Sequence, residues 1–157
     1  MSEDNPLFSP IDPSPFSIGI IAAQYNSKLS QALLDRVQDI LQENGSPKEM
    51  LVERVPGSHE VPAGLKMLLG AKTFSCLIGL GVVIKGSTSH HHLVADSAGN
   101  AIQSLVVEHG TPIINGIIVT EDLVSAEERI IGTIDRGKEF AHAALQMAKL
   151  NMKWTLI

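Results

Sequence analysis

The apolar residues of this chain fall into two alternating patterns. Residues 16–23, 76–84 and 113–119 are almost wholly apolar and too short for buried helices, so they predict strands covered on both faces. Residues 50–55 form a shorter run that carries Glu53 and Arg54, which predicts a strand at the edge of the sheet. Between and after these runs, apolar residues recur at helical spacing. They predict helices at residues 29–41, at 61–69, from Leu93 onward, from about 123 to 131 and from about 138 to 150.

This order of elements predicts a three-layer α/β sandwich of the flavodoxin-like type, with a four-stranded parallel sheet flanked by helices. The length of 157 residues suits one domain, which we assign to residues 16–157. Residues 1–15 are rich in proline, which disfavours a helix, and are interpreted as an N-terminal arm or flexible tail. That segment is expected either to be loose or to pack on a neighbouring subunit.

Composition argues against several classes of protein. The net charge is −5 and no basic block occurs, which argues against nucleic acid as the main partner. No apolar run approaches the roughly 20 residues that span a membrane, and the acidic N-terminus lacks the features of a secretory signal. The single cysteine, Cys76, falls in a predicted strand and is expected to be an inert core residue. We therefore expect a cytoplasmic protein that contacts no membrane.

Polar side chains gather where each predicted strand ends. They are Tyr25 and Asn26, residues 58–60, residues 85–92 and residues 120–122. Because the carboxyl ends of parallel strands share one edge of the sheet, these turns are expected to converge. Gly86-Ser87-Thr88 precedes a predicted helix and could hold a phosphate on backbone N–H groups and hydroxyls, although the triplet suits helix capping equally well.

Three consecutive histidines, His90, His91 and His92, follow that triplet. Consecutive side chains point in different directions, and no neighbouring carboxylate or cysteine completes a site, so no metal site is expected. Imidazole titrates near neutral pH, so one histidine beside an anion pocket is better suited to acid–base catalysis. The residues alone therefore indicate an α/β domain that binds a small phosphorylated or polar substrate.

At these turns the sequence resembles the lumazine synthases, which catalyse the penultimate step of riboflavin biosynthesis. The resemblance covers about residues 16–150, and its most specific strings are VPGSHEVP at residues 55–62 and GVVIKGSTSH at residues 81–90. Shorter matches are QYN at 24–26, PIINGI at 112–117 and AEER at 126–129. The resemblance implies a transferase that condenses 5-amino-6-(D-ribitylamino)uracil with 3,4-dihydroxy-2-butanone 4-phosphate. The product is 6,7-dimethyl-8-(D-ribityl)lumazine, phosphate and water are released, and neither cofactor nor metal is needed.

The resemblance also implies a role for each matching residue. Tyr25 would stack on the pyrimidine, and His90 would move protons as the catalytic residue. The other implied substrate-binding residues are Ser58, His59 and Glu60 around the ribityl chain and ring, Val82, Val83 and Ile84 through their backbone, Ser87, Thr88 and Arg129 at the phosphate, and Asn115, with Arg136 as a further candidate. Without the resemblance, the simplest interpretation of Arg129 is an exposed ion pair with Glu127 or Glu128 on one helix.

Family members assemble as homopentamers with active sites between adjacent subunits. Asn115 and Arg129 would then complete the pocket that Tyr25 and His90 of the neighbour begin. Some members join twelve pentamers into an icosahedral shell, and association with riboflavin synthase is a further expectation. This chain lacks the long insertion near residues 132–137 that tends to accompany members that stop at the pentamer.

Several positions depart from the family pattern. His59 and Asn115 replace residues that are usually aromatic, so the ring pocket is expected to be more polar than usual. His91-His92 stands where an aromatic–acidic pair is common, and these two histidines are expected at the surface or at an interface. Asp135-Arg136-Gly137 replaces the frequent Asn-Lys-Gly. These departures keep a second hypothesis open, namely a protein that binds flavin or lumazine without turnover.

Overall fold

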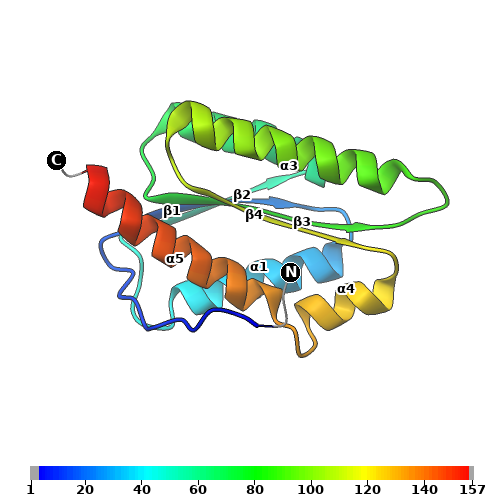
Figure 1. Cartoon of the computed structure of the whole chain (residues 1–157), viewed down its shortest axis with the longest axis horizontal. Helices are drawn as coiled ribbons and strands as arrows, with labels where there is room; N and C mark the ends of the chain where they lie inside the picture. Colours follow the sequence, from blue (N-terminus) through cyan, green and yellow to red (C-terminus); the bar gives the residue numbers. More distant parts are fainter. Residues whose placement is uncertain (1–3, 156–157) are drawn as a thin grey trace.

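A computed structural model describes residues 4–155 and has the predicted parallel sheet (Figure 1). Its four strands lie in the order β2-β1-β3-β4, so the strand with charged residues is at one edge, as predicted. Every neighbouring pair is parallel. The strands are β1 (Ser17–Ala23), β2 (Glu49–Val55), β3 (Cys76–Ile84) and β4 (Ile113–Thr120).

Helices cover both faces of this sheet, which confirms the three-layer flavodoxin-like architecture. In Figure 1, α3 lies on one face, while α1, α4 and α5 lie on the other. The short helix α2 packs beside α3. The helices are α1 (Ser27–Leu41), the single 3-10 turn η1 (Ser58–Glu60), α2 (Val61–Ala71), α3 (His90–His109), α4 (Leu123–Ile130) and α5 (Arg136–Thr155).

The side chains of β1 divide the core into two halves. Ile18 and Ile20 pack toward α1 and α5, whereas Ile21 and Ala23 pack toward α2 and α3. This alternation follows from the two-residue period of a strand, and it places apolar side chains on both faces as a central strand requires. Gly19 makes room for the side chains packed against it, because a methyl group there would lie only 2.5 Å from the side chain of Leu77 in β3 and 3.2 Å from that of Leu68 in α2.

Two helices begin earlier than their apolar patterns predict. Helix α3 begins at His90, three residues before Leu93. Helix α5 begins at Arg136 and extends to Thr155, so Gly137 lies inside a helix and not in a break. The reason is packing, since a methyl group at residue 137 would lie 2.8 Å from the Arg36 side chain. The glycine therefore lets α5 approach α1 closely.

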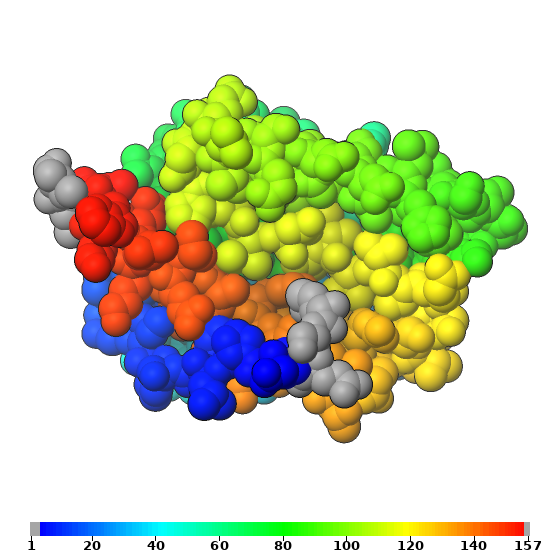
Figure 2. Space-filling view, viewed as in Figure 1, coloured from blue at the N-terminus to red at the C-terminus, as the bar shows by residue number. Residues whose placement is uncertain are grey.

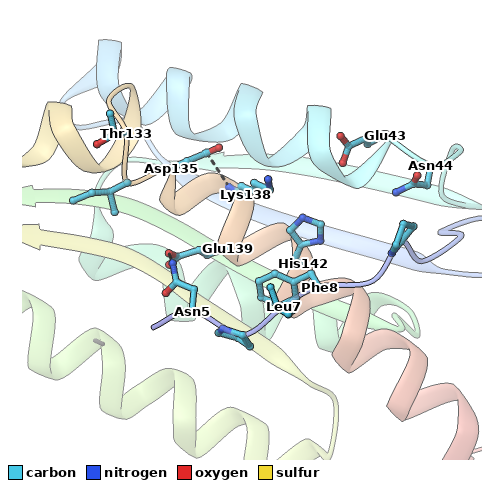
Figure 3. Close-up of a pocket in the computed structure, with 13 residues that line it drawn as sticks. Asn5, Leu7, Phe8, Glu43, Asn44, Thr133, Asp135, Lys138, Glu139 and His142 are labelled. Carbon is cyan, nitrogen blue, oxygen red and sulfur yellow. Dashed lines mark hydrogen bonds between the residues drawn. The ribbon is translucent and has the colours of Figure 1, made fainter. Parts of the chain in front are cut away.

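The N-terminal arm packs against its own chain in residues 4–15. The Phe8 ring stacks on the His142 ring with centroids 4.6 Å apart, and the Asn5 amide donates to Glu139 Oε1 at 3.0 Å. Figure 2 shows the arm in blue alongside α5. A cavity of about 680 Å³ lies between the arm, the residues after α1 and the start of α5 (Figure 3).

The remaining predictions about the core hold. Cys76 is fully buried, and burial raises the pKa of its thiol to about 12, which makes it inert as expected.

Within residues 4–155, no helix is long and apolar enough to cross a membrane.

An ion pair fixes the turn between α4 and α5. The Arg36 guanidinium donates to both carboxylate oxygens of Asp135, with the shortest N–O distance at 2.6 Å. Asp135 has a left-handed backbone, with φ of 51°, which aspartate and asparagine tolerate better than most residues. Hydrogen bonds from Arg36 are the main cause that lowers the pKa of Asp135 below its ordinary value of 3.8.

We expect Asp135→Asn to lower the free energy of unfolding by about 1–2 kcal/mol, because it keeps the backbone preference and removes the charge-assisted contact. The pKa of Asp135 is lower in the folded chain than in the unfolded chain. The extra stability of the wild type over the variant is therefore complete above the unfolded pKa near 3.8, and it is lost as the pH falls through the folded pKa. Urea unfolding at neutral and acidic pH measures this. Asp35→Asn, on the exposed face of α1, is the matched control and should change little. An equal loss at every pH would contradict the ion-pair explanation.

Candidate active site

The largest group of predicted site residues surrounds one cavity of about 480 Å³ at the carboxyl ends of β1 and β3. Four separate segments contribute to its wall, as the parallel arrangement predicts. The lining residues are Tyr25, Asn26, Gly57, Ser58, His59, Glu60, Val82, Val83, Ile84, His90, Leu93 and Val94. The sequence therefore correctly indicated that the first three turns and the end of the central strand would meet.

The end of β3 extends beyond its partner on one side. Strand β1 pairs with β3 only as far as Leu80, whereas β4 pairs with β3 through Ile84. Residues 81–84 thus have a ladder partner on the β4 side only, and Val82, Val83 and Ile84 line the cavity. A backbone edge of this kind offers N–H and C=O groups to a planar polar ligand.

Asn26 links two of the segments that form the cavity. Its side-chain amide donates to the Val82 carbonyl at 2.8 Å, and its backbone is left-handed with φ of 55°. Asparagine is one of the few residues other than glycine that visits this conformation readily. From the sequence, Asn26 was expected only as part of a turn, so this structural role was missed. Leu93 and Val94 were also missed, because their helical pattern indicated only a buried face.

The turn that contains Ser58, His59 and Glu60 is rigidly held. Glu60 Oε2 accepts from the Gly57 N–H at 2.9 Å. The Tyr25 ring lies against Gly57, where a methyl group would be 3.1 Å from the ring, and the tyrosine is 72% exposed. One face of an accessible aromatic ring is therefore fixed beside the cavity.

Ser58 is positioned by a contact with β3, and His59 by a contact with α3. Ser58 is buried and packs on Gly81 so closely that a methyl group at residue 81 would overlap its hydroxyl. His59 is exposed, and its Nε2 lies 3.3 Å from the Ser97 hydroxyl of α3. The glycine within β3 is thus required for the approach of η1 to the sheet.

The loop between β3 and α3 separates His90 from the predicted phosphate residues. His90 lines the 480 Å³ cavity, while Ser87 and Thr88 are exposed in the loop and do not line it. The Thr88 hydroxyl accepts weakly from the His90 N–H at 3.4 Å, and Ser89 at the helix start makes no side-chain cap. Within one chain, Ser87 and Thr88 are therefore close to His90 in sequence, but they do not belong to the cavity that His90 lines.

Asn115, Arg129 and Arg136 line a second and smaller cavity of about 210 Å³ along β4. Ile117, Ile118, Val119 and Phe140 complete it, and it shares no lining residue with the first cavity. Arg129 Nη1 donates to the Ser125 carbonyl at 2.9 Å, so the simple ion pair with Glu127 or Glu128 is not formed among the described residues. Phe140 was assigned only to the core by its helical spacing, and its place in this cavity was missed.

His91 and His92 turn away from the first cavity toward the end of β4. The expectation that both are at the surface or an interface is wrong for His91, whose side chain is only 3% exposed within its own chain. The expectation that no carboxylate lies nearby is also wrong, because Glu121 Oε1 lies 3.8 Å from His91 Nε2. Ligand atoms of His91, His92 and Glu121 all lie within 4.8 Å of one another. Sequence spacing could not reveal this, since residues 91 and 121 meet only through strand pairing.

Comparison with known proteins gives one consistent result. The sequence profile described as 6,7-dimethyl-8-ribityllumazine synthase matches residues 15–152. A Polaromonas protein named 6,7-dimethyl-8-ribityllumazine synthase is 36% identical over 141 residues, which is 89% of this chain and 90% of the relative. Proteins of the same name from Thermococcus kodakarensis and Burkholderia mallei are 35% and 34% identical, over 87% and 86% of this chain and 86% and 77% of theirs.

Proposed function

The chain belongs to the 6,7-dimethyl-8-ribityllumazine synthase family, and we propose that its two separate cavities are halves of one active site, joined between neighbouring subunits. As a member of this family the chain is a transferase of riboflavin biosynthesis. It condenses 5-amino-6-(D-ribitylamino)uracil with 3,4-dihydroxy-2-butanone 4-phosphate and releases phosphate and water. The observation that carries our proposal is the distribution of the family residues over two cavities without a common lining residue.

The 480 Å³ cavity suits the pyrimidine substrate. The accessible face of Tyr25 would stack on the ring. Backbone groups of Val82, Val83 and Ile84 would bond the ring edge, because within residues 4–155 this part of β3 has no partner strand on the cavity side and only the Val82 carbonyl is taken there, by Asn26. Ser58 and His59 would line the ribityl chain.

Glu60 suits the ribityl hydroxyls of that substrate. One of its carboxylate oxygens holds the Gly57 N–H, which fixes the orientation of the group. The second oxygen is then directed by the same contact and would accept from a hydroxyl. A carboxylate oriented in advance binds its ligand with less loss of side-chain freedom.

The cavity along β4 suits the phosphorylated substrate. Arg129 and Arg136 both line it, and a guanidinium presents several N–H groups in a fixed fork that matches phosphate. Ser87 and Thr88 of the neighbouring subunit, at the N-terminal end of its α3, would add hydroxyls and the positive end of a helix. Asn115 would close the pyrimidine cavity of that neighbour.

His90 is proposed as the residue that moves protons. The substrate itself supplies the amine that attacks the ketone, so water leaves as the imine forms and phosphate leaves by elimination. Both steps need protons transferred close to the cavity, where His90 stands among the lining residues. Most of the acceleration would come from holding two substrates in line, since the protein forms no covalent bond with either.

A homopentamer is the proposed assembly, and two surface features support a subunit contact. Strand β4 is an edge strand with exposed positions, which proteins usually cover. Large apolar side chains are also exposed, at Val107 of α3 and at Leu123 and Val124 of α4. Assembly of twelve pentamers into a shell, association with riboflavin synthase and a cytoplasmic location are proposed on the family resemblance.

The alternative of a protein that binds flavin or lumazine without turnover rests on the polar substitutions at His59 and Asn115. Incubation of the purified chain with both substrates, followed by lumazine fluorescence, separates the two hypotheses. Product formation well above the uncatalysed rate supports catalysis. Tight binding of lumazine with no such product would favour the binding protein.

We expect Arg129→Ala to weaken use of the phosphorylated butanone by about ten- to a hundredfold, because it removes a charge-assisted and partly desolvated contact. Affinity for the pyrimidine should stay nearly unchanged. Steady-state kinetics with each substrate varied in turn measure both effects. Arg54→Ala, whose guanidinium bonds within β1 and α1, is a control that should leave the butanone dependence intact. Equal loss for both substrates would contradict the assignment.

We expect His90→Ala to lower turnover by about tenfold or more without abolishing it, since general acid–base help is removed while substrate positioning remains. Oligomeric state and pyrimidine affinity should be retained. Single-turnover kinetics and size-exclusion chromatography measure these quantities. His92→Ala, at an exposed position two residues further along α3, should lower turnover less. If it reduced turnover more than His90→Ala did, with the oligomer intact, the proton-transfer role would belong elsewhere.

A further inference from the structure

A second cluster of titratable side chains lies outside both halves of the active site. It joins the first turn of α3 to the residue after β4, through His91, His92 and Glu121. None of the three lines the cavity of Tyr25 or the cavity of Arg129. The reaction described above therefore gives this cluster no role.

His91 is the unusual member. Its side chain is 3% exposed, and within residues 4–155 neither of its ring nitrogens has a hydrogen-bond partner. Burial of a polar group without a partner is costly in proteins, so such a group commonly bonds to water or to an ion. The nearest candidate, Glu121 Oε1, lies 3.8 Å away, which is beyond hydrogen-bonding distance.

The other two members make the cluster accessible. His92 and Glu121 are exposed, and the His91 and His92 rings lie with centroids 3.9 Å apart. An ion from solvent could therefore enter between His92 and Glu121 and reach the buried His91. The cluster thus offers two imidazole nitrogens and one carboxylate oxygen that lie within 4.8 Å of one another.

The distances suit a small transition-metal ion. With metal–ligand bonds of about 2.0–2.2 Å, ligand atoms of a tetrahedral site lie roughly 3.4 Å apart. The 3.8 Å separation of His91 and Glu121 is already close to this value, and the whole set lies within 4.8 Å. His92 and Glu121 are exposed, so theirs are the side chains that would move to close the difference.

The carboxylate is ionised and oriented for this purpose. Lys85 Nζ lies 2.8 Å from Glu121 Oε2, which leaves Oε1 toward His91. The hydrogen bond from Lys85 is the main cause that lowers the pKa of Glu121. Lys85 also opposes a bound cation, as does the positive end of α3.

We propose that His91, His92 and Glu121 form a binding site for a divalent transition-metal ion, best suited to Zn²⁺, with solvent as the fourth ligand. Two imidazoles and one carboxylate are a ligand set that zinc accepts, whereas Mg²⁺ and Ca²⁺ prefer oxygen ligands. The bound ion would join the start of α3 to the end of β4. It would stabilise the loop that carries Ser87 and Thr88 without contacting either substrate.

Equilibrium dialysis of the full chain against micromolar Zn²⁺, after treatment with a chelator, tests this proposal. We expect about one ion per wild-type chain, with Mg²⁺ unable to compete. Glu121→Gln and His92→Ala should each weaken binding at least tenfold, and both change exposed side chains, so the fold should survive. His91→Ala should do the same, and circular dichroism will show whether this buried change leaves the chain folded.

His109→Ala is the matched control, because His109 lies at the other end of α3 beside the single carboxylate of Glu108. It should bind Zn²⁺ as the wild type does. Replacement by Co²⁺ should give the intense visible absorption of a tetrahedral site in the wild type and in His109→Ala only. Absence of Zn²⁺ uptake by the wild type would overturn the proposal. Wild-type affinity in both Glu121→Gln and His92→Ala would overturn it equally.

Discussion

The parallel alignment of all four strands is the constraint on which the rest of the structure depends. It sends every strand end with polar residues to one edge of the sheet, where Tyr25, the turn of residues 58–60 and His90 meet around one cavity. The strand order β2-β1-β3-β4 places β4 at an edge of the sheet, where Asn115 and Arg129 line a different cavity. The parallel alignment thus brings the first group of residues together, and the strand order keeps the second group apart from it.

Unequal strand lengths turn this edge into a binding surface. Strand β3 outruns β1 after Leu80, so its last residues leave backbone groups open toward the cavity. In a completed sheet those groups would bond a neighbouring strand. Here Asn26 bonds the Val82 carbonyl, the other groups remain available for a planar ligand, and Gly81 lets Ser58 pack directly on the strand beside them. The closely packed Gly81 is therefore followed directly by residues of β3 whose backbone groups can bond a ligand.

The two-residue and helical periods of the sequence predicted the layers, and the charges of Glu53 and Arg54 predicted the edge position of β2. The polar turns predicted that Tyr25, residues 58–60 and His90 would meet, whereas Val82, Val83 and Ile84 came only from the family resemblance, and Leu93 and Val94 were missed. The periods could not show that Gly137 lies inside α5, because the benefit of glycine there comes from contact with Arg36 of another helix. The burial of His91 and its approach to Glu121 were missed for the same reason. Both depend on β3–β4 pairing, which brings residues 30 positions apart into contact. Local patterns predict elements well, whereas sites depend on which elements become neighbours.

The claim that one active site is shared by two subunits is tested most directly by mixing variants. His90→Ala and Arg129→Ala chains are purified separately, dissociated, combined in equal amounts and reassembled. If each site takes His90 from one subunit and Arg129 from the next, about one quarter of the sites in the mixture carry both intact residues. Lumazine formation should then rise to roughly a quarter of the wild-type rate, well above the average of the two variants assayed alone. A mixed sample that gives only this average would contradict the shared site.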